Sequence, residues 1–77
     1  MTSSEILASN LEYLKIKHGM TIDEIAEQAG VSPTTVRRAI QGAPLRTDTL
    51  DFIAEAFGML GWQLLKPLYR EIPSEEE

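Results

Sequence analysis

An apolar stripe with helical spacing marks the beginning of the chain. Its members are Leu7, Leu11 and Leu14. Apolar residues that recur every three to four positions are the main sequence signal of an amphipathic helix. Thr2 followed by Glu5 fits a capping box, in which each residue's side chain bonds the other's backbone N–H. We therefore predict a first helix over residues 3–18.

Two shorter helices are predicted next. The second covers residues 22–29, and Thr21 with Glu24 forms another capping box at its start. The third covers residues 33–41, with Ser32 as its N-cap and a proline at the first helical position, where the missing N–H is harmless. The positions that face inward are Ile22, Ile25, Ala26, Ala29, Val36, Ala39 and Ile40.

Glycines separate the periodic stretches from one another. Those at positions 19, 30, 42 and 58 each follow a helical pattern, which is where a left-handed residue commonly ends a helix. The segment Gly30-Val31-Ser32 leaves three residues between the second and third helices. That length is typical of the tight turn in a helix-turn-helix.

The rest of the chain predicts two more helices and a tail. The fourth helix is expected to be capped by Thr47 and to end at Phe57, and a short fifth helix over residues 60–66 is ended by a proline. We therefore predict an all-α, compact five-helix domain over residues 1–67. Residues 68–77 form an acidic C-terminal extension that we expect to be flexible at its end.

Charge is distributed unevenly along the sequence. The chain of 77 residues carries a formal net charge of -5. Residues 28–47 nevertheless contain no acid, and they hold Arg37, Arg38 and Arg46. The distribution of charge informs about nucleic-acid binding better than its sum. One cationic segment that includes the predicted third helix therefore lies within an acidic protein.

Several function classes lack support. The chain has no cysteine, and its one histidine, His18, lies at a helix end, so neither a metal site nor a cysteine nucleophile is expected. No serine or threonine has a base and an acid arranged around it for catalysis. We predict no enzyme activity and no cofactor. An apolar membrane span and a signal peptide are not recognised, so we expect a cytoplasmic protein.

The segment Thr21 to Arg38, TIDEIAEQAGVSPTTVRR, resembles the helix-turn-helix of the phage repressor and Cro (Xre) family. Without a gap, the match continues through Gly42 and Leu50-x-x-Ile53-Ala54-x-x-Phe57-Gly58. It covers about residues 5–66. The resemblance implies a lambda repressor-like fold with the helix-turn-helix at helices 2 and 3. It also implies binding of double-stranded DNA and, usually, a homodimer that acts on transcription.

The chain departs from the pattern of the family at three places. Ile22 stands where the family often has a glutamine that contacts a phosphate. Pro33 stands where some relatives carry a glutamine that reads a base. Ala39 and Ile40 replace the isoleucine and acid that are frequent at the end of the third helix. These departures leave fewer DNA contacts at the front of the third helix.

Docking like that of the relatives would place the third helix in the major groove. The resemblance assigns contacts with base edges to Thr34, Arg38, Ser32 and Gln41. Thr34 and Arg38 are one turn apart and share a face. Contacts with phosphates are expected from Thr21, Ile22, Thr35, Arg37 and Arg46. Each contact also has an alternative that involves no DNA. Arg37 and Arg38 can form an ordinary solvated helix face, Thr21 can act only as a helix cap, and Arg46 can be a solvated loop charge.

The end of the domain carries apolar residues beyond what four helices need. The set that we assign to a dimer interface is Trp62, Leu65, Leu68 and Tyr69. Core packing of the fifth helix explains the same residues. A single short recognition helix makes few contacts and twofold pairing doubles them, which favours the homodimer.

Two functions are compatible with the sequence. The first is a sequence-specific transcriptional regulator, such as a phage or plasmid repressor or an antitoxin with a toxin as protein partner. The second is a protein-binding module that kept the fold and lost DNA binding, which the acidic total, Ile22 and Pro33 motivate.

Overall fold

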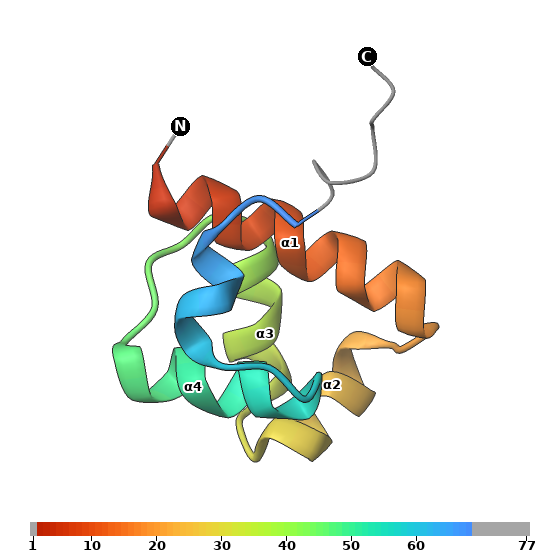
Figure 1. The fold of residues 1–77 in the computed structure, drawn as a ribbon. Coiled ribbons are helices and arrows are strands. Elements are labelled where there is room, and N and C mark those ends of the chain that lie inside the picture. Colours follow the sequence, from red (N-terminus) through yellow and green to blue (C-terminus); the bar gives the residue numbers. More distant parts are fainter. Residues whose placement is uncertain (1, 69–77) are drawn as a thin grey trace.

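The computed structural model describes residues 2–68, and this part of the chain forms helices and turns without a strand. The elements are α1 (Ser3–His18), α2 (Ile22–Ala29), α3 (Pro33–Ile40), α4 (Thr47–Ala56) and the 3-10 helix η1 (Gly61–Leu65), as Figure 1 shows. The bounds of α1 and α2 are those predicted, and α3 ends one residue earlier than predicted. The all-α class is confirmed for this range. Apart from Leu68, the predicted C-terminal extension lies outside the described residues.

Hydrogen bonds at the helix starts fix α1 and α2 locally. Thr2 Oγ1 accepts from the backbone N–H of Glu5 at 3.2 Å, and Thr21 Oγ1 accepts from that of Glu24 at 3.1 Å. The two glutamates accept in return from the threonine N–H groups, at 2.9 and 2.8 Å. Both predicted capping boxes are therefore confirmed.

The turn between α2 and α3 depends on a left-handed residue. Gly30 has φ 76° and ψ 29°, and its N–H donates to the carbonyl of Ala26 at 2.9 Å. The N–H of Val31 donates to the same carbonyl at 3.1 Å. Residues with a Cβ rarely adopt this conformation, whereas glycine adopts it freely. The other glycines predicted to end helices, at positions 19, 42 and 58, also have positive φ.

The predicted cap of α4 is wrong. Arg46 is the N-cap, Thr47 is already the first helical residue, and no side chain caps the helix. A charge takes the place of the cap, because the carboxylate of Asp48 lies in the first turn, where the helix dipole favours an anion. It also accepts from the N–H of Thr49 at 2.8 Å. The helix ends one residue before the predicted position.

The predicted fifth α-helix is a short 3-10 helix. Pro67 disfavours helical backbone at the residue before it, and Lys66 is extended, with φ -108° and ψ 139°. Upstream, Gly58 has positive φ and Leu60 is extended. Only five residues remain between these breaks, a length at which 3-10 geometry is common.

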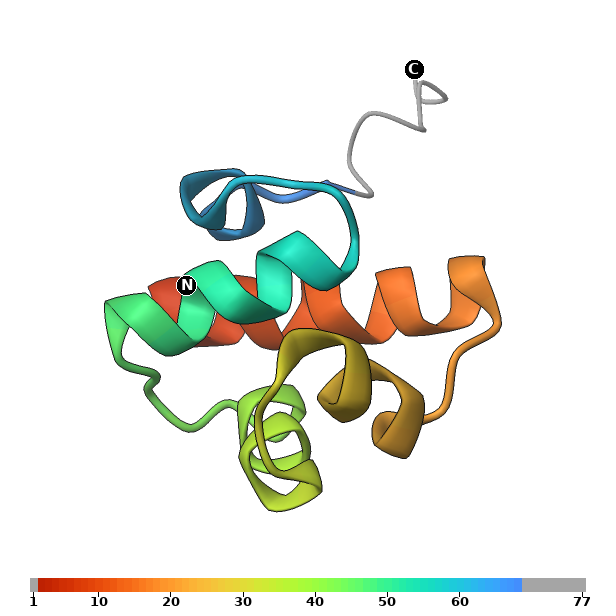
Figure 2. The same cartoon turned by 90° about the horizontal axis from the view of Figure 1, so that it is seen from below.

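One apolar core joins all five elements. Helix α2 packs against α3 and α4, α1 packs against α3 and η1, and η1 also packs on α4. In Figure 2, η1 lies on one side of α1 and α4, and the α2–α3 pair lies on the other side. The buried side chains are Leu7, Leu11, Leu14, Ile25, Ala26, Ala29, Val36, Ala39, Leu50, Ile53, Ala54 and Leu64. Ile22 and Ile40, predicted to face inward, are half-buried against this core.

A polar side chain within the core was not predicted. Asn10 is fully buried, and its Nδ2 donates to the carbonyls of Leu64 and Lys66 at 2.6 Å each. Its Oδ1 accepts from the N–H of Leu68 at 3.0 Å. Buried amides need such partners, and these three bonds supply them. The carboxamide therefore holds the end of η1, and the residues after it, against α1.

Candidate nucleic-acid interface

The start of α3 is organised by two hydroxyl groups. Ser32 Oγ accepts from the backbone N–H of Thr35 at 3.1 Å, which confirms Ser32 as the N-cap. The same oxygen lies 2.9 Å from Thr35 Oγ1, so the two hydroxyls bond each other. One hydroxyl hydrogen of the pair is left for a further acceptor. The DNA contacts expected of Ser32 and Thr35 therefore depend on a single shared donor.

The outer face of α3 carries a stripe of polar side chains. Thr34, Arg38 and Gln41 are spaced by four and three residues, so they share one face, and all three are exposed. We call this set the α3 stripe. Arg37 is also exposed and lies about 100° around the helix from Arg38. No carboxylate of residues 2–68 forms an ion pair with either arginine.

Packing determines which face of α3 points outward. Val36 and Ala39 have no exposed surface, and Ile40 packs partly against the core. Rotating α3 about its axis would bring these apolar side chains into water, at a cost of about 25 cal/mol for each Å². The orientation of the α3 stripe is therefore fixed by the core.

The structure brings Arg38 and Arg46 together. They line a shallow hollow of about 220 Å³ between α3 and the loop that leads to α4. Its lining residues are Thr35, Arg38, Pro44, Leu45, Arg46 and Thr49. Guanidinium and hydroxyl groups are the donors that phosphate oxygens accept best. The sequence placed these two arginines in one cationic segment but did not show that they share a hollow.

An acid at the edge of this hollow escaped the sequence analysis. Asp48 Oδ2 lies 3.5 Å from Arg46 Nη2, and the two side chains are 58% and 84% exposed. The acid-free segment ends one residue before Asp48, so counting charges by segment missed the pair. Exposed ion pairs are weak, at about 0–1 kcal/mol, and Arg46 can exchange this partner for a phosphate at little cost.

The start of α2 is less open to a phosphate than the sequence suggested. Thr21 uses its hydroxyl and its N–H in the capping box, and the carboxylate of Glu24 lies beside that N–H. Asp23 adds a second negative charge to this turn. Ile22 is half-buried against the core. Of the phosphate contacts expected of Thr21 and Ile22, only those through backbone N–H groups remain. The turn that offers these groups also carries two acids.

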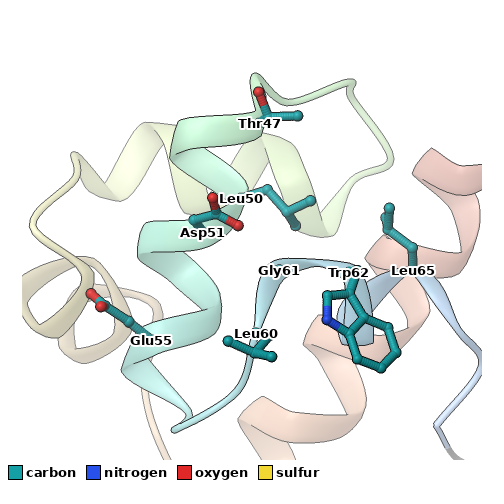
Figure 3. A pocket seen from close by; sticks show the side chains of 8 residues that line it. All are labelled: Thr47, Leu50, Asp51, Glu55, Leu60, Gly61, Trp62 and Leu65. Carbon is teal, nitrogen blue, oxygen red and sulfur yellow. The ribbon is translucent and has the colours of Figure 1, made fainter.

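The residues assigned to a dimer interface have different surroundings. Trp62 is 58% exposed, whereas Leu65 and Leu68 are half-buried and pack against the core. Tyr69 lies outside the described residues. Leu60, which the sequence assigned only to the start of a helix, is 60% exposed close to Trp62. Figure 3 shows both side chains beside a groove between α4 and η1.

A metal centre and a membrane-spanning helix have no counterpart in residues 2–68. No cluster of three or more histidines, cysteines or acids is suited to hold a metal ion in this range. None of the helices described is long and apolar enough to cross a membrane.

A family model described as helix-turn-helix matches residues 11–64. The chain belongs to this helix-turn-helix family, that of the phage repressors and Cro. The matched range of the helix-turn-helix domain begins within α1 and ends within η1, so it contains α2, α3 and α4 completely. No curated protein and no solved structure matches the chain.

Proposed function

We propose that this helix-turn-helix domain binds double-stranded DNA sequence-specifically, with α3 in the major groove, and regulates transcription. The observation that carries the proposal is the α3 stripe: Thr34, Arg38 and Gln41 are exposed on one face, Arg38 has no ion pair in residues 2–68, and the core holds that face outward. A helix with this orientation in a helix-turn-helix is the element that enters the major groove.

Each residue of the α3 stripe has a base edge that suits it. Arg38 can bind O6 and N7 of a guanine with two hydrogen bonds, the commonest specific contact in the major groove. Gln41 can pair with N6 and N7 of an adenine, and Thr34 offers a hydroxyl and a methyl group for a thymine. Ser32 is placed at the entry of the helix with the shared hydroxyl hydrogen as its donor.

Phosphate contacts position the domain on the duplex without reading sequence. Arg46 and Thr35 lie in one hollow with Arg38, and Arg37 lies to the other side of the α3 stripe. On the other flank, the N-terminus of α2 at Thr21 and Ile22 offers backbone N–H groups. Few cations are involved, so we expect a modest affinity for each subunit and a shallow dependence on salt.

The small number of contacts that one subunit can make favours binding as a homodimer. One eight-residue helix reads few base pairs, and a twofold pair doubles the contacts on two half-sites about one helical turn apart. A regulator of this kind acts on DNA in the cytoplasm, as a phage or plasmid repressor or as an antitoxin that also binds a toxin.

Selection from a random duplex library tests the proposal. We expect enriched duplexes with a twofold-related motif, and log affinity that falls linearly with log salt concentration. Arg38→Ala should cost about 1–3 kcal/mol on the selected duplex and relax the preference at one base pair. Lys17→Ala, which removes a cation from α1 outside the helix-turn-helix, is the matched control and should change binding little.

A second candidate is a protein-binding module that has lost DNA binding. The observation that favours it is the turn at the start of α2, where Asp23 and Glu24 put two negative charges beside Thr21, at a place expected to meet a phosphate. If selected and random duplexes both fail to bind at low salt, this candidate replaces the regulator.

A further inference from the structure

A shallow hollow of about 450 Å³ lies on the outer side of α1, beside the last residue of α3. We call it the α1 hollow, and its lining residues are Ala8, Ser9, Glu12, Tyr13, Ile16 and Ile40. Ile16 is 68% exposed, the largest exposed fraction among the large apolar side chains of residues 2–68. A single exposed apolar residue is ordinary, but here Ile16, Ile40 and the ring of Tyr13 line one surface. The α1 hollow therefore offers a binding place for apolar side chains from elsewhere.

The α1 hollow has a charge on each flank. Glu12 lines it and is exposed, and Lys17 Nζ lies 5.7 Å from the centroid of the Tyr13 ring. With about 100° for each residue, positions 12 and 17 are about 140° apart around α1, and positions 13 and 16 lie between them. Neither charge has an ion-pair partner in residues 2–68. The apolar floor of the hollow is thus bordered by an acid on one side and by a cation on the other.

The described part of the chain ends at the edge of this hollow. The N–H of Leu68 donates to Asn10 Oδ1 at 3.0 Å. In Figure 1 the end of the described chain, in blue, accordingly lies against the middle of α1. Tyr13 follows Asn10 by three positions, so the two are neighbours on the helix surface. The residues that come next in the sequence are Tyr69, Arg70, Glu71, Ile72 and Pro73. This segment therefore starts within about one helical turn of the α1 hollow.

The segment after Leu68 fits the hollow in its spacing. Ile72 precedes Pro73, and the residue before a proline favours extended backbone. In an extended segment, residues two apart are about 6.8 Å from each other and point to the same side. On a helix, residues four apart are about 6 Å from each other along the axis and share a face. An extended segment that runs along α1 therefore keeps its alternate side chains in step with positions four apart on the helix.

This register joins apolar groups with each other and opposite charges with each other. Its pairs are Tyr69 with Tyr13, Glu71 with Lys17, Arg70 with Glu12, and Ile72 with Ile16. An aromatic pair, an aliphatic pair and two ion pairs are all favourable contacts. A segment that ran towards the start of α1 would instead take Glu71 away from Lys17 and towards Glu5, another acid. The charges therefore select the direction towards the end of α1.

We propose that residues 69–72 of this chain dock in the α1 hollow as an extended segment in this register. The hydrogen bond at Asn10 tethers the segment beside the hollow, so the occupant belongs to the same molecule. Because the tether is short, docking costs little loop-closure entropy. The segment covers Ile16 and completes the apolar packing along the outer side of α1.

Nuclear Overhauser spectroscopy of the full chain tests the docking. With the isoleucine methyl groups labelled with carbon-13, we expect cross peaks that join Ile72 to Ile16 and to Ile40. A mixture of two differently labelled samples separates cross peaks within one chain from those between chains. We expect them within one chain, because Leu68 is held on α1 of the same molecule.

Ile16→Ser tests the contribution of the exposed isoleucine. The cross peak between Ile72 and Ile40 should weaken several-fold, because the segment loses part of its apolar contact. Leu60→Ser is the matched control. Leu60 is 60% exposed but does not line the α1 hollow, so this variant should keep the cross peak. Circular dichroism checks that both variants fold.

A charge exchange tests the direction of the segment. Lys17→Glu and Glu71→Lys should each weaken the cross peak between Ile72 and Ile16 about twofold, the size expected for an exposed ion pair. The double variant Lys17→Glu/Glu71→Lys should recover most of the loss. A segment that runs in the opposite direction does not produce this recovery.

Three outcomes overturn the proposal. One is the absence of both cross peaks from Ile72, which leaves the α1 hollow to a different protein. A second is a set of cross peaks that arise only between chains, which assigns the hollow to a second copy. The third is the absence of recovery in the double variant. DNA takes no part in these measurements, so their failure leaves the proposed function as it stands.

Discussion

The side-chain nitrogen of Asn10 lies 2.6 Å from the carbonyl oxygen of Leu64, although 54 positions separate the two residues in the chain. This bond joins the first helix to the last helical turn. It helps to hold η1, which forms one side of the groove between α4 and η1, together with the packing of the buried Leu64 in the core. One carboxamide and one leucine thus connect α1 and the core to the segment that carries the exposed Trp62.

Replacing this asparagine should destabilise the domain. In Asn10→Ala three buried or half-buried backbone groups lose their partner, and we expect a loss of about 1–3 kcal/mol in the free energy of unfolding. Urea denaturation followed by circular dichroism measures the change. Ser9→Ala, one position earlier on α1, is the control and should stay within about 0.5 kcal/mol of the wild type. Equal stability of the two variants would contradict the role given to Asn10.

Ser32 allows folding and DNA binding to be separated. Ser32→Ala removes the cap of α3 and should lower stability by about 1 kcal/mol. Ser32→Asp keeps a capping oxygen and adds a favourable charge to the helix dipole, so its stability should stay near that of the wild type. Its carboxylate would nevertheless face the DNA, and affinity at low salt should fall. Thermal melts and fluorescence anisotropy with a selected duplex check the two effects, and unchanged affinity of Ser32→Asp would move Ser32 out of the interface.

The ion pair of Arg46 with Asp48 predicts a variant that binds DNA more tightly. Asp48→Asn removes a negative charge from the edge of the hollow that holds Arg38 and Arg46. At roughly 8 Å in water one charge contributes about 0.5 kcal/mol, so we expect about a twofold gain in affinity at low salt. The same change removes an acid from the first turn of α4 and should cost a few tenths of a kcal/mol in stability. Glu27→Gln, which neutralises an exposed acid of α2, is the control for net charge.

Replacing Gly30 should lower the free energy of unfolding through backbone strain alone. An added Cβ at this position meets no atom within 4 Å, so the space is open, but φ is 76°. Gly30→Ala should therefore lose about 1–2 kcal/mol of stability through the left-handed conformation. Gly30→Asn should lose less, because asparagine tolerates this region better. If alanine and asparagine cost the same, a cause other than the backbone is at work.

Most of the fold could be predicted from the sequence because its signals are local. Capping boxes lie within four residues, and the glycine that ends α2 follows its helix directly. The features that the sequence analysis missed depend on residues that are far apart in the chain or on weak local signals. The nature of η1 depends on breaks on both sides of a short segment, and the burial of Asn10 depends on carbonyls more than fifty positions away. Helical spacing does place Asn10 on the apolar stripe, three residues after Leu7 and four before Leu14, but it does not show which groups its carboxamide bonds.

In the candidate site, too, local features could be predicted from the sequence and features that depend on the path of the chain could not. The shared face of Thr34 and Arg38 follows from helical spacing, and both side chains are exposed, as is that of Gln41. The hollow shared by Arg38 and Arg46 requires the path of the loop between α3 and α4, which no periodicity encodes. The exposure of Leu60 could not be predicted either, because apolar residues near a helix start are as compatible with the core as with the surface.

The α3 stripe has a consequence for how this domain can change over generations. Thr34 and Arg38 form no side-chain hydrogen bond or ion pair within residues 2–68, and Gln41 contributes only its backbone to the end of α3. Substitutions at these three positions should therefore leave the folding free energy nearly unchanged. Under the proposed function, descendants of this chain could then change their target sequence by single steps, without passing through an unstable intermediate.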